Sequence, residues 1–347
     1  MRSLTFVVGT GRSGSTALSR ILSAHPEVLS LNEYMASVGS TAFPGHPVGG
    51  AEFWRALAEP TPHFAGLLRS GLALPEFLYT RLPGGRYDAV GGIPALSLMV
   101  LPHLTDDPDG LLDALAGTVS AWPERSPAAH HRALFDDLCG RLGRTHVVER
   151  SGYSTPWAAL LRRTFPEARF VHLFRDGPDC ALSMSRHVGY RTIIQLREIE
   201  DRCGGTPVAE LTAEQVRGLP PHLAALLGET FDPALVDDRP LPAAAFGELW
   251  STLVADGVAF MGSLPAERGA DLAYEDLLDD PAGELTRLAE FIGVTPDSAW
   301  LRDATASLDS GRRGAARTLP AGERTALERA CAPGARALAT GRGEFRT

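Results

Sequence analysis

Lysine is absent from this sequence of 347 residues, and all 33 of its basic residues are arginines. Aspartate and glutamate together number 42, so the formal net charge is −9. A chain with this charge lacks the broad basic surface that nucleic acids need, and we expect no nucleic acid among its partners. Any anionic ligand has to be met by arginines gathered at one place, because the charge of the whole chain repels it.

Cysteine and long apolar runs are also scarce. The four cysteines, at positions 139, 180, 203 and 331, show no CxxC spacing, so we expect reduced thiols rather than a zinc site or a disulfide framework. No apolar run approaches the roughly 20 residues that cross a bilayer. The first apolar run begins at Leu4, which leaves no room for a signal peptide before it. These absences predict a cytoplasmic protein without a membrane span or a bound metal.

The most informative stretch is FVVGTGRSGST, residues 6–16. An apolar strand is predicted to run into a glycine-rich turn, and a helix to follow from about Gly14 to Ala24. This order gathers unpaired backbone N–H groups and the positive end of a helix around one point, which favours phosphate or sulfate. A turn that only joins strand to helix is the alternative, but this turn is dense in hydrogen-bond donors.

The spacing of Gly9, Gly14 and Thr16 is that of a P-loop, GxxxxGK[ST], with Ser15 at the lysine position. P-loop kinases and NTPases use that lysine on the β- and γ-phosphates and the Ser or Thr on Mg2+. Here the nearest cation is Arg12, so the loop predicts an anion held by one guanidinium, hydroxyls and backbone N–H groups. The residues expected to bind it are Arg12, Ser13, Gly14, Ser15 and Thr16.

A second strand–helix–strand unit is predicted over residues 145–187, with one strand at Arg169–Phe174. Connections of this length join parallel strands in right-handed βαβ units. The sequence therefore predicts an α/β, P-loop-like fold of three layers with a central parallel sheet. Longer helices are expected over Pro127–Leu142 and residues 243–261, 281–292 and 322–332.

Three charged residues are predicted to follow strands of this sheet: Glu33, Arg150 and Arg175. Ligands bind at the carboxyl edge of open parallel sheets, so these side chains should lie beside the glycine-rich turn. Two arginines and an anion-binding turn predict a ligand with two separated anionic groups. The alternatives are that each arginine pairs with its neighbour, Glu149 or Asp176, and that Glu33 is a solvated carboxylate.

Three blocks of sequence resemble the sulfotransferases that use 3'-phosphoadenosine-5'-phosphosulfate (PAPS): GTGRSGSTALSRILSAHPEV, FVHLFRDGPDCALSMSR and LAYEDLLDDPAGELTRLAEFIGV. They occur in the order and spacing of that family. The resemblance implies that PAPS is the co-substrate and that residues 12–16 hold its 5'-phosphosulfate. It also implies that Arg175 and Ser183 hold the 3'-phosphate.

The resemblance is greatest to the tyrosylprotein and related bacterial sulfotransferases, in which a glutamate follows the loop arginine by 21 residues. Glu33 follows Arg12 by the same interval, 33 − 12 = 21, which implies that Glu33 takes the proton of the acceptor. Arg150 stands where that group has a lysine that stabilises the transferring sulfuryl group, so the charge is kept and its geometry changed. The implied reaction is metal-free transfer of a sulfuryl group to a hydroxyl acceptor, a small molecule, with Glu33, Arg12 and Arg150 as catalytic residues.

The rest of the chain is predicted to belong to the same single domain, residues 1–347, as two helical insertions. Residues 36–143 are expected to shape the acceptor pocket, and residues 188–242 to form a lid of short helices. Histidines of the first insertion lack metal-ligand spacing and are expected at the surface or at helix caps: His46, His63, His103, His130 and His131.

Two other functions stay open from the sequence. One is a P-loop phosphotransferase or NTPase, against which the missing lysine argues. The other is a catalytically silent nucleotide-binding protein, against which the presence of Arg12, Glu33, Arg175 and Ser183 argues. If Glu33 is not the base, His46 and His103 are the next candidates. Arg312-Arg313-Gly314 weakly resembles the basic C-terminal block of the cytosolic sulfotransferases, and its role is open. The oligomeric state and the identity of the acceptor are open as well.

Overall fold

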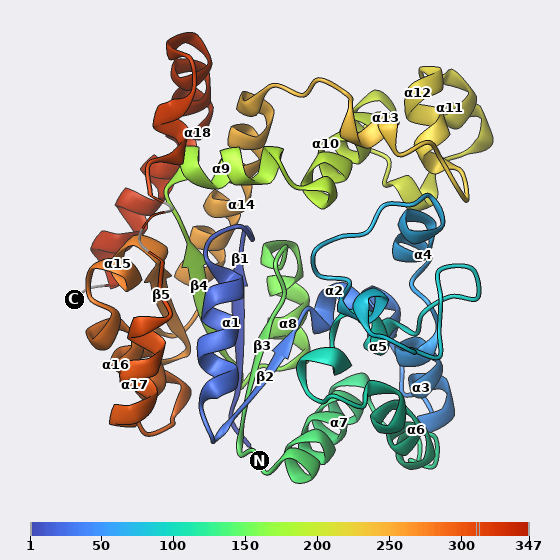
Figure 1. Ribbon diagram of the computed structural model, residues 1–347, viewed down its shortest axis with the longest axis vertical. Coiled ribbons are helices and arrows are strands. Elements are labelled where there is room, and N and C mark those ends of the chain that lie inside the picture. The colour runs from blue at the N-terminus through green and yellow to red at the C-terminus, as the bar shows by residue number, and fades with distance from the viewer. Residues whose placement is uncertain (1, 310, 312, 346–347) are drawn as a thin grey trace.

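Five short parallel strands form a single sheet at the centre of the molecule (Figure 1). The structure is a computed structural model that describes residues 2–309, 311 and 313–345. The strands are β1 (Leu4–Gly9), β2 (Val28–Asn32), β3 (His146–Arg150), β4 (Arg169–Phe174) and β5 (Gly269–Ala273). Their order is β2-β3-β1-β4-β5, and every neighbouring pair is parallel. The predicted α/β fold with a central parallel sheet is confirmed.

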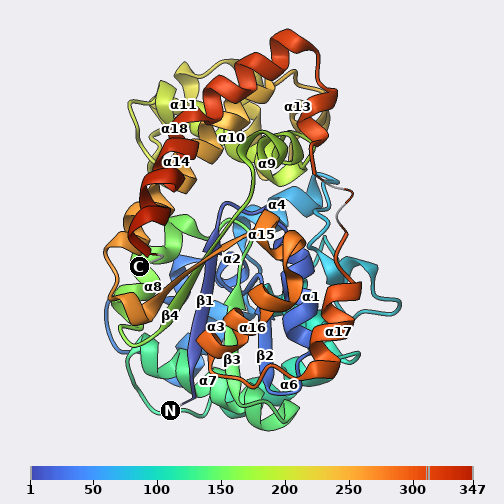
Figure 2. The same cartoon turned by 90° about the vertical axis from the view of Figure 1, so that its left-hand side faces the viewer.

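One face of the sheet is covered by helices from the two ends of the chain (Figures 1 and 2). They are α1 (Ser15–Ala24), α15 (Tyr274–Asp279), α16 (Pro281–Ile292) and α17 (Ser298–Ala306). Val7 and Val171 of the sheet pack there against Leu22 and Leu288. Each strand alternates between two covered faces, which is why β1 is buried at all six positions.

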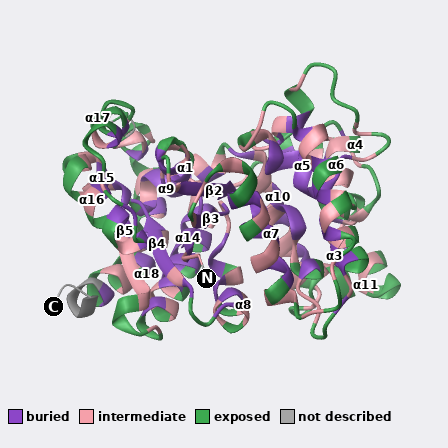
Figure 3. Cartoon of the chain, turned by 90° about the horizontal axis from the view of Figure 1, so that it is seen from below, coloured by how far each residue is buried: buried purple, intermediate pink, exposed green. Residues whose placement is uncertain are grey.

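The opposite face is covered by helices from residues 34–142 and by the helix after β3, and Phe6 of the sheet packs there against Phe165 and Phe170. The helices on this side are α2 (Tyr34–Val38), α3 (Gly50–Ala58), α5 (Ala95–Met99), α6 (Pro108–Val119), α7 (Pro127–Leu142) and α8 (Ala158–Thr164). The sheet is thus the middle of three layers, and most of its residues are drawn as buried in Figure 3, whereas the first three positions of β5 are intermediate.

The two predicted insertions share a hydrophobic cluster of their own, in which Leu74 and Phe77 of the first pack near Ile199 and Leu223 of the second. The helices around it are α4 (Pro62–Arg69), α10 (Val188–Arg202), α11 (Ala213–Gly218), α12 (Pro221–Ala224) and α13 (Ala234–Asp237). Residues 188–242 were expected to form only short helices, and the 15 residues of α10 exceed that expectation.

A third group of helices packs beside β4: α9 (Gly177–Ser185), α14 (Ala243–Gly262) and α18 (Ala321–Phe345). Helix α18 is longer than the predicted 322–332, because the sequence pattern stops at Pro333 and the helix does not. Ser251 of α14 compensates for the proline: its hydroxyl donates to the carbonyl oxygen of Ala330 at 2.7 Å and accepts the N–H of Gly334 at 3.2 Å. The backbone groups around the proline therefore keep partners.

Short 3-10 turns join these elements: Ser40–Ala42, Leu78–Arg81, Leu101–His103, Thr155–Trp157, Val208–Glu210, Ala225–Leu227, Ala266–Arg268 and Ala315–Thr318. Within the described residues, no helix has the length and apolar character needed to span a bilayer. The four cysteines are unpaired.

The expectation for the histidines is wrong at two positions. His130 and His131 of α7 are fully buried, and neither caps a helix. Their Nε2 atoms lie 2.7 Å from the carbonyl oxygen of Val48 and 2.9 Å from that of Ala42, so the two rings tie down the segment before α3. Burial lowers the pKa of His131 to about 3, which keeps the ring neutral. Tertiary contacts of this kind leave no local pattern in the sequence.

Candidate active site

Three residues of the glycine-rich turn between β1 and α1 adopt a left-handed backbone conformation. Arg12 has φ 56°, Gly11 φ 69° and Gly14 φ 84°, all left-handed. A Cβ at Gly11 would lie 1.8 Å from the hydroxyl oxygen of Tyr190, which itself donates to the carbonyl oxygen of Thr10 at 2.6 Å. No side chain caps the start of α1, so its first N–H groups are left for a ligand.

A polar cavity of about 350 Å3 opens at this turn. The residues that line it include Arg12, Gly14, Ser15, Thr16, Glu33, Arg150, Arg175 and Ser183. The structure thus brings together every candidate site residue except Ser13. The hydroxyl of Ser13 is buried and donates to the carbonyl oxygen of Leu173 at 3.4 Å, so its side chain supports the turn from behind.

Arg175 and Ser183 form one wall of this cavity. The guanidinium of Arg175 lies 5.3 Å from the centre of the Tyr274 ring and pairs with Asp179 at 3.5 Å. Ser183, two turns along α9, accepts a hydrogen bond from Nε of Arg12 at 3.3 Å. The two residues, far from the turn in sequence, therefore face it across the cavity.

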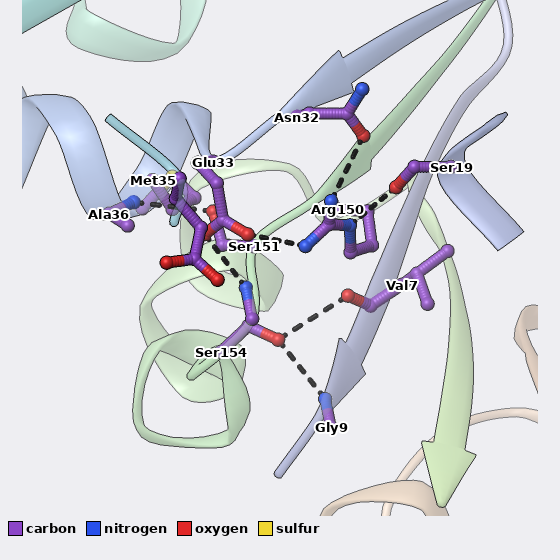
Figure 4. Close-up of polar contacts among 12 residues, drawn as sticks. Val7, Gly9, Ser19, Asn32, Glu33, Met35, Ala36, Arg150, Ser151 and Ser154 are labelled. Carbon is purple, nitrogen blue, oxygen red and sulfur yellow. Dashed lines mark hydrogen bonds and ion pairs between the residues drawn. The ribbon is translucent and has the colours of Figure 1, made fainter. Parts of the chain in front are cut away.

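Glu33 and Arg150 form a buried ion pair at the point where β2 and β3 end (Figure 4). Both side chains are only 6% exposed, so neither the solvated Glu33 nor the pairing of Arg150 with Glu149 is correct. Glu33 is in a left-handed conformation, φ 56°, and its second oxygen accepts the N–H of Gly152 at 2.9 Å. Arg150 also donates to Ser19 at 2.6 Å and to Asn32 at 3.4 Å. Both carboxylate oxygens of Glu33 are therefore held in place.

Glu149 supports this pair from the other face of β3, and sequence reasoning missed that role. Its Oε1 accepts the N–H of Met35 at 3.1 Å and the hydroxyl of Ser151 at 2.6 Å, and Ser151 accepts the N–H of Ala36 at 3.2 Å. These bonds fix the first turn of α2 directly after Glu33. Full burial raises the pKa of Glu149 to about 7. Alternation along a strand buried on both faces is the one sequence signal that could have pointed to it.

A second, apolar cavity of about 290 Å3 adjoins the polar one. The residues shared by both cavities are Arg12, Ser15, Thr16, Glu33, Glu76 and Arg150. Glu76 lies between Arg12, at 3.7 Å, and Nε2 of His187, at 3.3 Å. Sequence reasoning missed Glu76, because it belongs to a loop without regular structure.

His46 and His103, the alternative bases suggested by the sequence, differ in their positions relative to the cavities. His103 lines the polar cavity, where desolvation and the charge of Arg150 lower its pKa to about 4. His46 lines neither cavity. Arg313 is directed to Asp279, at 2.6 Å, outside both cavities, and Arg312 lies outside the described residues. In the part of the chain that the structure describes, no three His, Cys, Asp or Glu side chains group as a metal site.

Residues 5–44, which contain the turn and Glu33, match the sulfotransferase family. No curated protein sequence matches significantly. Among solved structures, the sulfotransferase domain from the curacin biosynthetic pathway is similar over 96% of this chain and 97% of its own, with a TM-score of 0.50 and 16% identity.

Two others are the sulfotransferase domain of the Synechococcus PCC 7002 olefin synthase (TM-score 0.46, 15% identity, 96% of this chain and 94% of its own) and the sulfotransferase of Alicyclobacillus acidocaldarius (0.43, 16%, 100% and 100%). The turn-containing segment matches the family in sequence, and the fold around it is shared with a sulfotransferase domain. The resemblance of this chain to the sulfotransferase family is thereby confirmed.

Proposed function

We propose that this protein transfers the sulfuryl group of PAPS to the hydroxyl of a small molecule, with Glu33 as the general base. The observation that carries the proposal is the meeting of the polar and apolar cavities at Arg12, Glu33 and Arg150. A donor in one cavity and an acceptor in the other would meet beside a carboxylate and two guanidinium groups. We also propose that residues 36–143 and 188–242 are insertions in one domain, since both contribute to the apolar cavity.

The polar cavity fits the donor by its chemistry. Arg12, the hydroxyls of Ser15 and Thr16 and the uncapped start of α1 suit a 5'-phosphosulfate. Arg175 and Ser183 suit the 3'-phosphate on the far wall. The Tyr274 ring beside Arg175 adds an apolar surface to the same cavity.

The reaction asks three things of these residues. Glu33 accepts the proton of the acceptor hydroxyl, and the acceptor oxygen bonds to sulfur as the bond from sulfur to the 5'-phosphate oxygen breaks. Arg12 and the N–H groups of the turn neutralise the departing phosphate. As Glu33 takes the proton, Arg150 loses its ionised partner, so its charge becomes available to the sulfuryl oxygens.

Binding of the product nucleotide tests the donor site. We expect 3'-phosphoadenosine-5'-phosphate (PAP) to raise the melting temperature well above the effect of AMP or ATP at equal concentration, because only PAP reaches both anion sites. Arg175→Ala should remove most of this preference. Arg163→Ala, an exposed arginine of α8, is the matched control and should keep it. Equal shifts for all three nucleotides in the wild type would refute the two-site donor model.

The phosphotransferase alternative has its own test. Arg12→Ala should weaken PAP binding and sulfuryl transfer together, because this side chain lines the donor cavity and the reaction point. Mg2+ with ATP should neither rescue that variant nor support turnover by the wild type. ATP turnover that depends on Mg2+ would favour a phosphotransferase.

A further inference from the structure

The apolar cavity carries its charge on one side only. Its four charged side chains, Arg12, Glu33, Glu76 and Arg150, are those that it shares with the polar cavity. The rest of the wall comes from α2, α4, α5, α10, the loop after α4 and the segment after β3. The apolar side chains there include Phe64, Leu74, Met99, Trp157, Tyr190 and Ile193. A molecule in this cavity would thus meet polar groups at one end and hydrocarbon elsewhere.

Two histidines, His63 and His187, belong to the remaining wall. Desolvation at the cavity wall lowers the pKa of His63 below its usual value, which favours the neutral ring. Nδ1 of His187 accepts the N–H of Gly189 at 3.2 Å, which places the ring hydrogen on Nε2, facing Glu76 at 3.3 Å. With both nitrogens engaged, His187 orients Glu76. A charged group on the body of an acceptor would find no carboxylate or guanidinium partner in this part of the wall, and burying it would be costly.

The volume indicates the size of the part of the acceptor that this cavity can hold. An apolar cavity of about 150 Å3 holds one benzene molecule. At about 290 Å3, this cavity has nearly twice that volume, which suits two fused rings. The wall holds several aromatic rings: those of Tyr153 and Tyr190 lie 6.1 Å apart in an edge-on arrangement, and Phe64 and Trp157 line the same cavity. Edge and face contacts with a flat ring system are favoured in such a site.

We propose that the acceptor is an uncharged aromatic hydroxyl compound of about two fused rings, seated in this cavity with its hydroxyl toward Glu33. The proposal rests on the proposed sulfotransferase function. The phenolic proton passes to Glu33, the phenolic oxygen bonds to sulfur, and PAP leaves with the electron pair of the broken S–O bond. A sugar has too little apolar surface for this wall, and a tyrosine within a peptide brings polar backbone groups for which the apolar wall offers few hydrogen-bond partners.

Two adjacent isoleucines of α10 provide a matched pair of variants. Ile193 lines the apolar cavity and not the polar one, whereas Ile194 lines neither, and both are half-buried. Ile193→Phe should take up part of the apolar cavity without adding bulk to the polar one. We expect it to lower kcat/KM for 2-naphthol about tenfold or more, as changes in an apolar pocket do. Phenol, with one ring, should lose less. Ile194→Phe should stay within about twofold of the wild type for both compounds.

The experiment follows PAPS-dependent sulfation of 2-naphthol, phenol, 6-hydroxy-2-naphthoate and a tyrosine-containing peptide. Binding of 2-naphthol is followed in parallel by its fluorescence, with PAP present, and PAP binding by thermal shift. We expect kcat/KM for 2-naphthol to exceed that for the carboxylate and the peptide by at least tenfold. A preference for either of these, equal effects of the two isoleucine variants, or no binding of 2-naphthol would overturn the proposal. Failure of PAP to bind would instead overturn the donor site, while the fluorescence would still report on the acceptor cavity.

Discussion

Glu149→Gln should remove a pH-dependent cost to stability beside the catalytic pair. Burial raises the pKa of Glu149 from 4.5 to about 7, so the folded protein binds this proton more tightly than the unfolded chain does. The tighter binding of this proton therefore stabilises the folded protein fully below pH 4.5, and this stabilisation is lost as the pH rises to about 7. The shift of 7 − 4.5 = 2.5 units corresponds to roughly 3 kcal/mol, of which roughly 2–3 kcal/mol falls between pH 5 and 8.5.

Glutamine keeps the oxygen that accepts the bonds from Met35 and Ser151, and it has no charge to bury. The assay is urea unfolding of wild type and variant at pH 5 and pH 8.5. Comparing the two proteins at each pH cancels the contribution of the other titrating groups, which both proteins share. Between pH 5 and pH 8.5, the free energy of unfolding of the variant should rise by roughly 2–3 kcal/mol relative to that of the wild type. Glu290→Gln, an exposed position of α16, should change by less than about 0.5 kcal/mol. A pH-independent difference between Glu149→Gln and wild type would refute the reasoning.

Two further predictions concern the pair and the turn. Arg150→Lys places one ammonium where a guanidinium contacts Ser19, Asn32 and Glu33. The free energy of unfolding should therefore fall by about 1–3 kcal/mol, while PAP affinity stays near wild type. A turnover equal to wild type would show that the several N–H donors of the Arg150 guanidinium are not needed. Residue 11 is in a left-handed conformation, and Gly11→Ala would bring a Cβ to 2.6 Å from the carbonyl oxygen of Gly152. This variant should therefore lose PAP binding and have a lower melting temperature. The control Gly117→Ala, at an exposed position within a helix, should raise the free energy of unfolding by up to about 1 kcal/mol. Normal PAP binding by Gly11→Ala would contradict the close packing of the turn.

The parts of the fold that the sequence predicted well are those with local signals at both ends. Helix α7 begins after the capping Ser126 and ends at Gly143, which has φ 66°. Helix α16 begins after the capping Asp280 and ends at Gly293, which has φ 97°. Each of these side chains acts within one turn of its own helix, so the pattern is complete in the sequence.

The parts that the sequence did not predict depend on contacts between distant segments. Helix α18 passes Pro333 because Ser251, more than 80 positions earlier, bonds to the interrupted turn. In the site, the strand-end positions of Glu33 and Arg150 were predicted from local pattern, but their pairing was not. Glu76 likewise reaches Arg12 only through the packing of a loop without regular structure.

The central claim is that Glu33 removes the proton of the acceptor in a PAPS-dependent reaction. The most direct measurement is transfer from labelled PAPS by wild type, Glu33→Gln and the control Glu290→Gln, together with their PAP affinities. Glutamine keeps the shape and an acceptor for Arg150 but has no basicity. We expect unchanged PAP affinity and a kcat lower by roughly 10²-fold or more for Glu33→Gln, with the control near wild type. Near-native turnover by Glu33→Gln would contradict the claim and make His103 the next residue to test.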